Sequence, residues 1–532
     1  MVFIIGIIVS FILYIAIGAI LSKNVKNTED FYISGRSGST LMVTGTLVAS
    51  FLSTVSFMGE AGFSYEGYPI PLLILVIFNG SGYIFGVFLF GRYLRRSKSL
   101  TVPEYFGNRF NSRKVRLIAA ITTVIGIAAY LVAVTQGSSL LLSEIFNIPY
   151  AIAIVIMCIV FASFTVMSGA KGVMVNDTIM FFIFSLAAYV SFPFIIKATG
   201  GFPAAIMKAA NNVEKPNIFS WHGVTGSGAY MGSPTDVLIW AVIMGLVWGS
   251  VVAISPWQSS RYLMAKNEHV AIRSGVWATI SIFTIYIFLH SSMAMINNVN
   301  SSIHPTEKVF IWAAMHLVPS WLGVIIVSGI MAAALSSCAT FLQLIGSSIA
   351  NDIIQPFSKK KYSDQKLLSF SRISMIMVTL IILIIGIWQP PAVMWIGYFA
   401  ATLFAASWGP VAFSSVFSKT VTSLGAFWSI IAGFLGVIAG EAIGTLIKLP
   451  IYLHPVIIGF ILSSITLYVV SKFGVITEEE VSYQRMLHQQ PMEENEKREM
   501  AITKRYPTYL IISGIAVVII TFVFYYWPIS HA

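Results

Sequence analysis

Long apolar stretches recur along the whole chain, and shorter stretches rich in charge, glycine or proline separate them. A helix needs about 20 consecutive, mostly apolar residues to cross a lipid bilayer, and these stretches reach that length. Fourteen helices are expected, at approximately residues 3–22, 40–65, 69–91, 117–145, 149–169, 174–197, 236–260, 274–297, 319–350, 368–389, 391–417, 421–447, 453–471 and 508–527. The pattern therefore predicts an all-α polytopic membrane protein with about 14 transmembrane helices.

The composition of the 532 residues agrees with this fold class, because 57% of them are hydrophobic and only 10% are charged. A soluble protein carries about 25% charged residues, so the composition excludes a soluble enzyme or a disordered scaffold. The lipid bilayer is the expected partner. A net charge of +11 often indicates nucleic-acid binding; here topology explains the charge, and no nucleic-acid partner is expected.

The basic residues lie mainly on one side of the predicted membrane. If the loop at 92–116 is cytoplasmic, strict alternation of the helices places all but five of the 32 Lys and Arg residues on the cytoplasmic side. The five external residues are Lys197, Lys208, Lys215, Lys308 and Lys448. Basic residues accumulate in cytoplasmic loops, and one miscounted helix would invert the bias after it. The distribution predicts an even number of crossings, with both termini external.

Two of the predicted helices carry signals for an interruption. Gly59 and Gly62 flank Glu60 in the second helix, and Pro256 removes a backbone donor in the seventh. Interrupted helices five spans apart indicate an inverted repeat with the substrate between its halves. The predicted units are 1–39 (first transmembrane helix and cytoplasmic loop), 40–197 (first inverted repeat), 198–235 (external loop), 236–417 (second inverted repeat) and 418–532 (peripheral C-terminal helices with a charged cytoplasmic loop, 472–507).

Carboxylates at membrane depth are the first candidates for function, because an unpaired charge in a bilayer is costly. Glu60 and Glu66 lie toward the outer end of the second helix, and Glu441 lies late in the twelfth. Asp177 lies three residues into the sixth helix. Asp177 fits an ion site or ion path, and it equally fits a residue at a helix end that extends to the cytoplasmic interface.

Neutral oxygen atoms in the ninth helix form a second candidate. Ala333, Ser336 and Ser337 have the spacing i, i+3 and i+4, so one carbonyl and two hydroxyls can face the same point. If the second helix unwinds, the carbonyls of Ala49 and Leu52 become free as well. Together these atoms suit a hard cation such as sodium; the alternative is close helix packing with hydroxyls bonded to their own helix.

Other polar and aromatic side chains near the interruptions are weaker candidates for contacts with a solute. They are Tyr130, Gln136, Trp248, Trp257 and Tyr398. Aromatic residues more commonly pack inside a bundle or form the belt at the membrane interface, and a glutamine often links two helices. The sequence contains no Walker loop, HExxH motif or nucleophile elbow, so an enzyme is not expected.

Several segments together resemble the sodium:solute symporter family. They are TEDFYISGRS, ASFLSTVSFMGEAGFSYEGY, RYLRRSKSLTVPEYFGNRF, SGAKGVMVNDTIMFF, PWQSSRYLMAKNEHVAIRSGVW and AAALSSCATFLQ. The similarity extends in order from about residue 20 to residue 420. It implies the leucine-transporter-like inverted repeat with broken core helices 1 and 6, and carriage of solutes such as sugars, proline, pantothenate, sialic acid or monocarboxylates.

The resemblance also implies site residues. The family's sodium site transfers to the carbonyls of the first core helix and to the carbonyl and hydroxyls of the eighth, at Ala49, Leu52, Ala333, Ser336 and Ser337. Asp177 matches the acid that contributes in some members to a second ion site or the exit path, with Thr340 as a neighbour. Ala339 stands where a further hydroxyl is expected, so this second site is incomplete.

The substrate-contacting positions of the family are matched only in part by this sequence. Ser53 and Ser56 match positions that face the solute in some members, and Trp248 and Pro256 match the broken sixth core helix of proline carriers. Phe51 stands where proline carriers have an acid, and the third core helix lacks the arginine of sialic-acid carriers. The pair Ser260 and Arg261 replaces the Gln-Arg pair common in the family. Neither proline nor sialic acid is favoured as the solute.

The expected function is import of a small organic solute by sodium symport through alternating access, in a multi-pass protein of the plasma membrane, and a bacterial cell membrane is the expected location. Sodium is the expected co-transported ion. A monocarboxylate or a pantothenate-like acid is favoured over a sugar, because a helix break can hold a carboxylate without an arginine. A sodium-independent or proton-coupled carrier or exchanger, or a non-transporting solute sensor, remains the alternative. The sequence predicts no particular oligomeric state.

Overall fold

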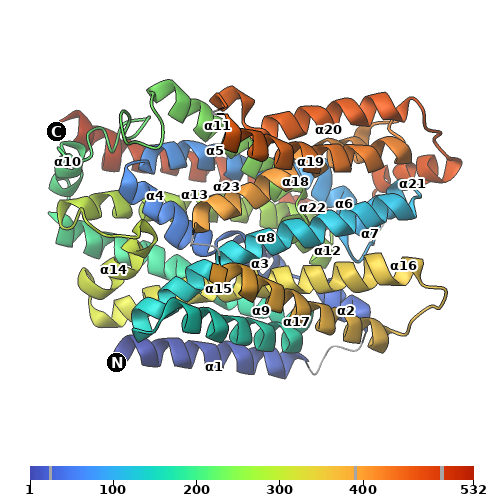
Figure 1. Ribbon diagram of the computed structural model, residues 1–532, viewed down its shortest axis with the longest axis horizontal. Coiled ribbons are helices and arrows are strands. Elements are labelled where there is room, and N and C mark those ends of the chain that lie inside the picture. The colour runs from blue at the N-terminus through green and yellow to red at the C-terminus, as the bar shows by residue number, and fades with distance from the viewer. Residues whose placement is uncertain (23–26, 389–391, 448, 492–496, 532) are drawn as a thin grey trace.

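The computed structural model describes residues 1–22, 27–388, 392–447, 449–491 and 497–531. The long helices of the chain lie side by side along one axis (Figure 1). Within the described ranges there is no β-strand, and Gly38 and Ala265 form one isolated β-bridge. The all-helical fold class is therefore confirmed. Lys448 and the part of the charged loop at 492–496 lie outside the described residues.

The helices differ widely in length. The long helices are α1 (Val2–Ser22), α3 (Thr40–Phe51), α5 (Pro69–Gly86), α8 (Arg113–Phe146), α9 (Tyr150–Thr199), α11 (Pro234–Ile254), α13 (Glu268–Met295), α15 (Ser320–Ser347), α17 (Asp364–Trp388), α18 (Val393–Phe417), α19 (Ser423–Leu446), α20 (Pro455–Ser471) and α23 (Tyr506–Thr521). The shorter ones are α2 (Thr28–Ile33), η1 (Ser34–Arg36), η2 (Val55–Glu60), α4 (Ala61–Glu66), η3 (Val87–Gly91), α6 (Arg92–Arg96), α7 (Val102–Arg109), α10 (Ala204–Ala210), α12 (Pro256–Met264), η4 (Ile296–Asn298), η5 (Thr306–Lys308), α14 (Val309–His316), η6 (Ser348–Ile354), α16 (Gln355–Phe357), η7 (Ile451–Leu453), α21 (Glu478–His488), α22 (Lys497–Thr503), η9 (Phe522–Tyr526) and α24 (Trp527–Ser530).

In the described part of the chain, eleven helices are long and apolar enough to cross a membrane, and twelve if one bent pair counts as a single span. Two shorter apolar segments, the first part of α9 (Tyr150–Val166) and α20 (Pro455–Ser471), coincide with two of the expected spans. They contain fewer than 18 residues, so the predicted count of 14 stays a prediction. The polytopic character of the protein does not depend on these two helices.

Burial separates a central group of helices from a peripheral one. In Ser320–Phe357, which contains α15, 89% of the most apolar 18-residue segment is buried. In Lys497–Ser530, which contains α23, only 6% of the corresponding segment is buried. α1 also exposes most of its apolar side chains. Apolar side chains that no protein covers are stable in contact with lipid tails. The central helices therefore form the core, and α1 and α23 lie at its periphery with their apolar side chains exposed.

Both predicted helix interruptions are present. α3 ends at Phe51, Leu52 is extended with φ −72° and ψ 113°, and the chain resumes as η2 and α4 at an angle of 56°. α11 ends at Ile254, because Ser255 is extended (φ −61°, ψ 149°) and Pro256, which has no N–H group, begins α12. The first break lies before Gly59, and Gly59 itself lies within a helical turn.

Small residues allow the neighbouring helices to approach these breaks closely. A Cβ atom at Gly137 of α8 would lie 2.5 Å from the Cβ of Thr54, just after the break in α3. A Cβ atom at Gly59 would lie 2.8 Å from the backbone nitrogen of Met394 in α18. Neither glycine can be replaced by a residue with a side chain without a shift of its neighbour. α8 and α18 therefore pack very closely against the broken helix.

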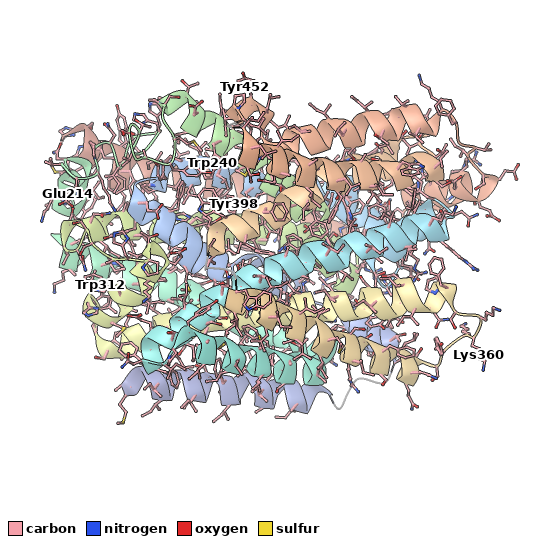
Figure 2. All side chains as sticks on the ribbon, viewed as in Figure 1. Glu214, Trp240, Trp312, Lys360, Tyr398 and Tyr452 are labelled. Atoms are coloured by element: carbon pink, nitrogen blue, oxygen red, sulfur yellow. The ribbon has the colours of Figure 1, made fainter. Side chains whose placement is uncertain are left out.

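The two ends of the bundle carry different loops. In Figure 1 both chain termini lie at the same end as α10 and α14, whereas α2, α7, α16 and α21 lie toward the opposite end. Figure 2 likewise shows Glu214 and Lys360 at opposite ends of the bundle. An even number of crossings requires this arrangement. We refer to the end with α10 and α14 as the predicted external end and to the other as the predicted cytoplasmic end.

Candidate functional site

A buried carboxylate joins three helices beside the break in α3. The Asp177 side chain in α9 accepts a hydrogen bond from the Thr46 hydroxyl of α3 at 2.5 Å and one from the Ser336 hydroxyl of α15 at 2.6 Å. Asp177 is 1% exposed, which excludes the interpretation that it extends to the membrane interface. The end of α3, which contains Ala49 and Leu52, is thereby held against the part of α15 that contains Ser336.

Several oxygen atoms near this contact lack a hydrogen-bond donor. Among the described residues, none donates to the carbonyl of Ala49 or of Leu52, because the extended Leu52 takes the next N–H groups out of helical register. The buried Ser337 hydroxyl has no partner in the described part of the chain. Buried polar groups are almost always paired, so unpaired oxygens on facing helices are suited to a bound cation. Ala333 lies one turn before Ser337 on the same helix.

The donor set at this point is neutral and consists of oxygen atoms. Hard cations prefer oxygen ligands, whereas zinc and other transition metals require histidine, thiolate or carboxylate groups. Among the described residues there is no group of three His, Cys, Asp or Glu side chains that suits such a metal. The arrangement therefore fits an alkali cation better than a transition metal.

The predicted second ion position contains an arginine. Arg261 of α12 is 1% exposed, its guanidinium lies 3.9 Å from a carboxylate oxygen of Asp177, and it donates a hydrogen bond to the Thr340 hydroxyl. Asp177 and Thr340 are the two residues expected at a second ion site or along the exit path. The guanidinium carries the charge that a second cation would supply, and sequence reasoning noted Arg261 only as a departure from the family pattern.

Polar side chains connect the two broken helices to each other. The Gln258 amide of α12 donates to the Ser50 hydroxyl of α3 at 3.3 Å, and the Tyr83 hydroxyl donates to the Gln258 carbonyl oxygen at 3.1 Å. Gln258 was not singled out from the sequence, because nothing in its local pattern distinguishes it from a packing residue.

The two serines after the break contact tyrosines. Ser53 shares a 3.4 Å hydrogen bond with the Tyr130 hydroxyl, and Ser56 shares one of 2.9 Å with the Tyr286 hydroxyl. Ser53, Ser56 and Tyr130 are thus brought together around the interrupted segment. In contrast, Gln136 accepts from the backbone N–H of Ala392 at 3.4 Å, which links α8 to the start of α18.

Aromatic rings surround the two breaks. The Trp248 ring lies 5.5 Å from Phe51, 6.1 Å from Tyr130 and 5.5 Å from Tyr398, measured between ring centroids. Trp257 follows Pro256 and lies 5.5 Å from Tyr130. The indole N–H groups of Trp248 and Trp257 are buried and, among the described residues, have no acceptor. Both tryptophans therefore carry an unused hydrogen-bond donor beside the breaks.

Glu60 lies at the centre of the site, although it is not among the predicted sodium and substrate positions. Its carboxylate, 3% exposed, accepts hydrogen bonds from the Tyr286 hydroxyl at 2.7 Å and from the Tyr398 hydroxyl at 2.8 Å. The sequence predicts that Glu60 is a carboxylate at membrane depth, but it does not indicate which side chains form hydrogen bonds with it. Glu66, by comparison, is exposed and accepts from the Thr306 hydroxyl at 2.6 Å.

A layer of aromatic side chains covers the site toward the predicted external end. Trp240 stacks on Tyr398 with ring centroids 6.3 Å apart, and Figure 2 shows the two residues together in the half of the bundle that includes this end. Phe63 of α4 lies 5.3 Å from Trp240, and Tyr230 of the external loop stacks on Trp395 at 4.5 Å. Tyr398, whose hydroxyl bonds to Glu60, is part of this layer.

The loop at 198–235 also contacts α4, the part of the broken helix after the break. The Lys215 amine donates to the Tyr65 carbonyl at 2.6 Å and lies 3.8 Å from the centre of the Tyr65 ring. Burial lowers the pKa of Lys215 to about 8, because the charged amine loses hydration. The unfolded chain, with a lysine pKa near 10.4, therefore binds more protons between these two values, and stability rises with pH there.

We expect this rise to disappear in the variant Lys215→Met. Between about pH 8 and pH 10 the apparent melting temperature of the wild type should increase relative to that of the variant, as the cost of burying the charged amine is relieved. Differential scanning fluorimetry across this range measures the difference. Lys208→Met, at an exposed lysine of α10, is the matched control and should follow the wild type. Parallel curves for Lys215→Met and the wild type would contradict the assignment.

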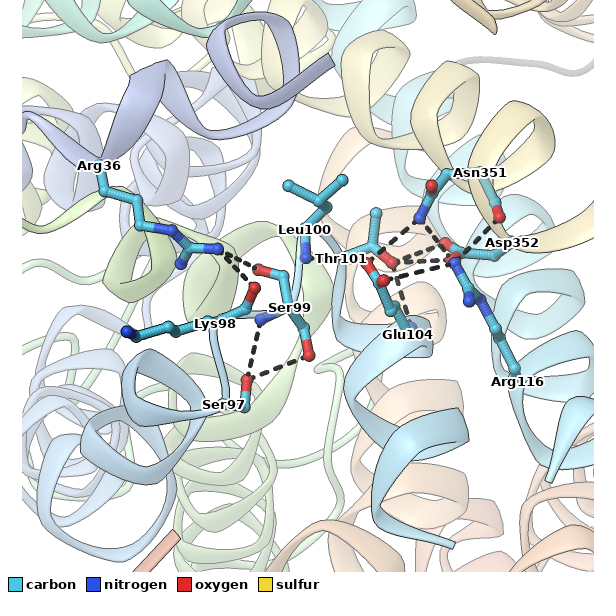
Figure 3. A network of polar contacts seen from close by, with 10 residues as sticks. All are labelled: Arg36, Ser97, Lys98, Ser99, Leu100, Thr101, Glu104, Arg116, Asn351 and Asp352. Atoms are coloured by element: carbon cyan, nitrogen blue, oxygen red, sulfur yellow. Dashed lines mark hydrogen bonds and ion pairs between the residues drawn. The ribbon is translucent and has the colours of Figure 1, made fainter. Parts of the chain in front are cut away.

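A polar network closes the predicted cytoplasmic end (Figure 3). Asp352 of η6 accepts from the Thr101 hydroxyl at 2.7 Å and from Arg116 of α8 at 2.9 Å. Arg116 also donates to the Asn351 carbonyl at 3.0 Å, and Asn351 donates to Glu104 of α7 at 3.3 Å. The network ties α7 and α8 to η6, which directly follows α15.

Known proteins resemble this chain in sequence and in fold. The sequence model of the "Sodium:solute symporter family" matches residues 31–433. A sodium/proline symporter of Escherichia coli (strain K12) is 25% identical over 484 residues, which cover 86% of this chain and 91% of the relative. A sodium/pantothenate symporter of Haemophilus influenzae (strain ATCC 51907 / DSM 11121 / KW20 / Rd) is 21% identical, with coverages of 88% and 96%.

Among solved structures, a Na+-coupled sialic acid symporter in a substrate-bound outward-open state shares the fold. The TM-score is 0.76 at 17% sequence identity, and the match covers 90% of this chain and 99% of that structure. The family match covers most of the chain and includes the two broken helices, α9 and α15. The protein therefore belongs to the sodium:solute symporter family, a family of transporters rather than enzymes.

Proposed function

We propose that this protein imports a small organic solute by sodium symport in a plasma membrane. The observation that carries the proposal is the set of unpaired oxygens at the contact of α3 and α15: the carbonyls of Ala49 and Leu52 and the hydroxyl of Ser337. Ser336 and the Ala333 carbonyl complete the five sodium ligands that the sequence predicts. A neutral oxygen site releases a monovalent cation readily, which a transport cycle requires.

Coupling follows from the shared use of the broken helix. Sodium would bind the carbonyls at the end of α3, and the solute would contact the residues directly after the break, such as Ser53 and Ser56. Each ligand therefore stabilises the same ordered segment and increases the affinity for the other. Sodium that enters across 100 mV, inside negative, contributes about 2.3 kcal/mol, which supports roughly fiftyfold accumulation of the solute.

Alternating access is the proposed transport cycle. The two interruptions belong to the units 40–197 and 236–417, which we propose to be inverted repeats among 14 transmembrane helices. The bond between Ser50 and Gln258 supports this proposal, because it places the two broken helices next to each other. Opening toward the outside would separate the aromatic layer around Trp240, and opening toward the cytoplasm would separate the network around Asp352.

We further propose that one sodium ion moves in each cycle. The Arg261 guanidinium lies against Asp177 and Thr340 and supplies the positive charge at the second position. A second sodium there would be repelled by a buried charge. We therefore expect the initial uptake rate to depend on sodium concentration with a Hill coefficient of about 1.

Reconstituted proteoliposomes test the function. We expect a labelled solute from a panel of organic acids, sugars, amino acids and betaines to accumulate when external sodium is present, and not when potassium replaces it. Uptake that persists after the sodium gradient collapses, or that follows a proton gradient alone, would favour the alternative carrier or exchanger. Solute binding without any transport would favour a sensor. A Hill coefficient near 2 would contradict the single-ion proposal.

A further inference from the structure

Glu60 is a buried carboxylate without a cation. No Lys, Arg or His side chain in the described ranges forms an ion pair with it, and the two groups that donate to it are the uncharged hydroxyls of Tyr286 and Tyr398. Burying an ionised carboxylate without an opposite charge is strongly unfavourable. The other buried carboxylate of the site, Asp177, has Arg261 beside it. Glu60 therefore requires a positive charge that the protein does not supply.

Aromatic rings form the surroundings of this carboxylate. Tyr286 and Tyr398, which bond to Glu60, belong to a ring cluster with Phe51 and Trp248. The centroid distances are 6.4 Å between Phe51 and Tyr286, 5.5 Å between Phe51 and Trp248, and 5.5 Å between Trp248 and Tyr398. The faces of such rings attract cations, and groups of rings recognise quaternary ammonium groups. The cluster lies at the break of α3, where both halves of the candidate site meet.

We propose that the transported solute is a small zwitterion, and that Glu60 and this aromatic cluster hold its ammonium or quaternary ammonium nitrogen. The inference rests on the proposed sodium symport, because it names the solute of that same site. The unpaired indole N–H of Trp248 is a donor for the carboxylate of the zwitterion. The solute thus keeps the carboxylate that the sequence favours and adds a cationic group.

The charges of the loaded site support a zwitterion over an anion. Arg261 neutralises Asp177, sodium brings one positive charge, and Glu60 brings one negative charge. A zwitterion leaves the total at zero, whereas a simple monocarboxylate leaves an additional negative charge buried next to Glu60. A sugar would also keep the total at zero, but it would give Glu60 no local cation and would meet mainly ring faces in place of hydrogen-bonding groups.

The test measures binding to the purified full-length protein in nanodiscs, by tryptophan fluorescence and by thermal stability, in sodium and in potassium. The probes are glycine betaine, L-proline and L-alanine as zwitterions, and acetate, pantothenate and glucose as controls. We expect at least one zwitterion to bind in sodium with an affinity well above that of every control. The variant Glu60→Gln should weaken this binding by about tenfold to a hundredfold, since it removes a charged partner.

Two further comparisons make the result specific. Glu66→Gln changes an exposed glutamate of the same broken helix and should bind like the wild type. Trp248→Phe keeps an aromatic face and should bind the zwitterion more tightly than Trp248→Leu does. Sodium alone should still stabilise Glu60→Gln, and this result would show that the variant is folded. It would also show that sodium binding is intact, so a failure of the zwitterion proposal can be distinguished from a failure of sodium coupling.

Three outcomes would overturn the proposal. The first is that no zwitterion of the panel binds, although sodium stabilises the protein. The second is that acetate, pantothenate or glucose binds most tightly. The third is that Glu60→Gln abolishes a pH dependence of uptake without weakening zwitterion binding, which would identify Glu60 as a proton-transfer group.

Discussion

The double variant Ser336→Ala, Ser337→Ala is expected to lose sodium-stimulated uptake while it is still expressed and inserted into the membrane. Two of the five proposed sodium ligands are removed, and a hydrogen-bonding contact to a charged group contributes about 1.5–3 kcal/mol. Removing both should therefore raise the sodium concentration for half-maximal uptake by at least about a hundredfold. Uptake of the labelled solute in proteoliposomes, measured against sodium concentration, gives this value.

The single variant Ser337→Ala distinguishes a loss of sodium binding from a loss of protein stability. Among the described residues the Ser337 hydroxyl has no partner, so alanine removes an unpaired buried polar group and should leave the sodium-free protein at least as stable as the wild type. The rise in melting temperature on adding sodium should largely vanish. Ser336→Ala differs, because it also removes the 2.6 Å hydrogen bond to Asp177 and should destabilise the protein without sodium.

Ser347→Ala is the matched control for both variants. Ser347 lies on the same helix, and its hydroxyl donates at 3.0 Å to the Leu344 carbonyl of its own helix. We expect this control to keep wild-type sodium dependence. Undiminished sodium dependence in the double variant would refute the assignment of the site, even if the protein is confirmed as a symporter.

The variant Arg261→Met is expected to cause the largest loss of stability of any single change at the site. Arg261 and Asp177 are each 1% exposed, and removing one member of a buried ion pair leaves the other charge without a partner. Such a change typically costs about 3–5 kcal/mol. The apparent melting temperature should fall markedly in sodium-free buffer, and scanning fluorimetry measures the fall.

A second change should recover much of that loss. In the double variant Asp177→Asn, Arg261→Met both charges are gone, so the unpaired carboxylate no longer remains in the core. Arg113→Met, at an exposed arginine near the start of α8, is the control and should be close to neutral. Equal stability of Arg261→Met and the wild type, or additive losses in the double variant, would contradict the pairing of the two charges.

The sodium dependence of Arg261→Met also tests how many sodium ions bind in each transport cycle. If the guanidinium takes the place of a second cation, the variant leaves Asp177 and Thr340 free for one. Added sodium should then stabilise this variant more than it stabilises the wild type, and the Hill coefficient should exceed 1. The same measurement with potassium distinguishes a specific site from a general effect of ionic strength.

The sequence by itself determined the features that depend on short stretches of chain. Length and hydropathy specify which segments cross the membrane, because each segment must satisfy its own backbone hydrogen bonds in lipid. Pro256 alone specifies where α11 ends, since proline has no N–H group. Gly59 and Gly62 indicate that the second predicted helix is interrupted, and the carbonyls expected to become free, those of Ala49 and Leu52, lie directly at the observed break, Leu52 to Thr54. No residue at the break itself has an intrinsic preference strong enough to mark its position.

Only the tertiary structure decided which polar groups meet. Thr46 lies 131 positions and Ser336 lies 159 positions from Asp177 along the chain, and no local pattern encodes their shared carboxylate. The same holds for Arg261 beside Asp177, and for the two tyrosines on Glu60. Helix periodicity specifies which face of each helix is polar, whereas the pairing of faces depends on how helices of similar apolar character pack together. That packing leaves unpaired oxygens beside the break in α3 and places the Glu60 carboxylate between two tyrosine hydroxyls.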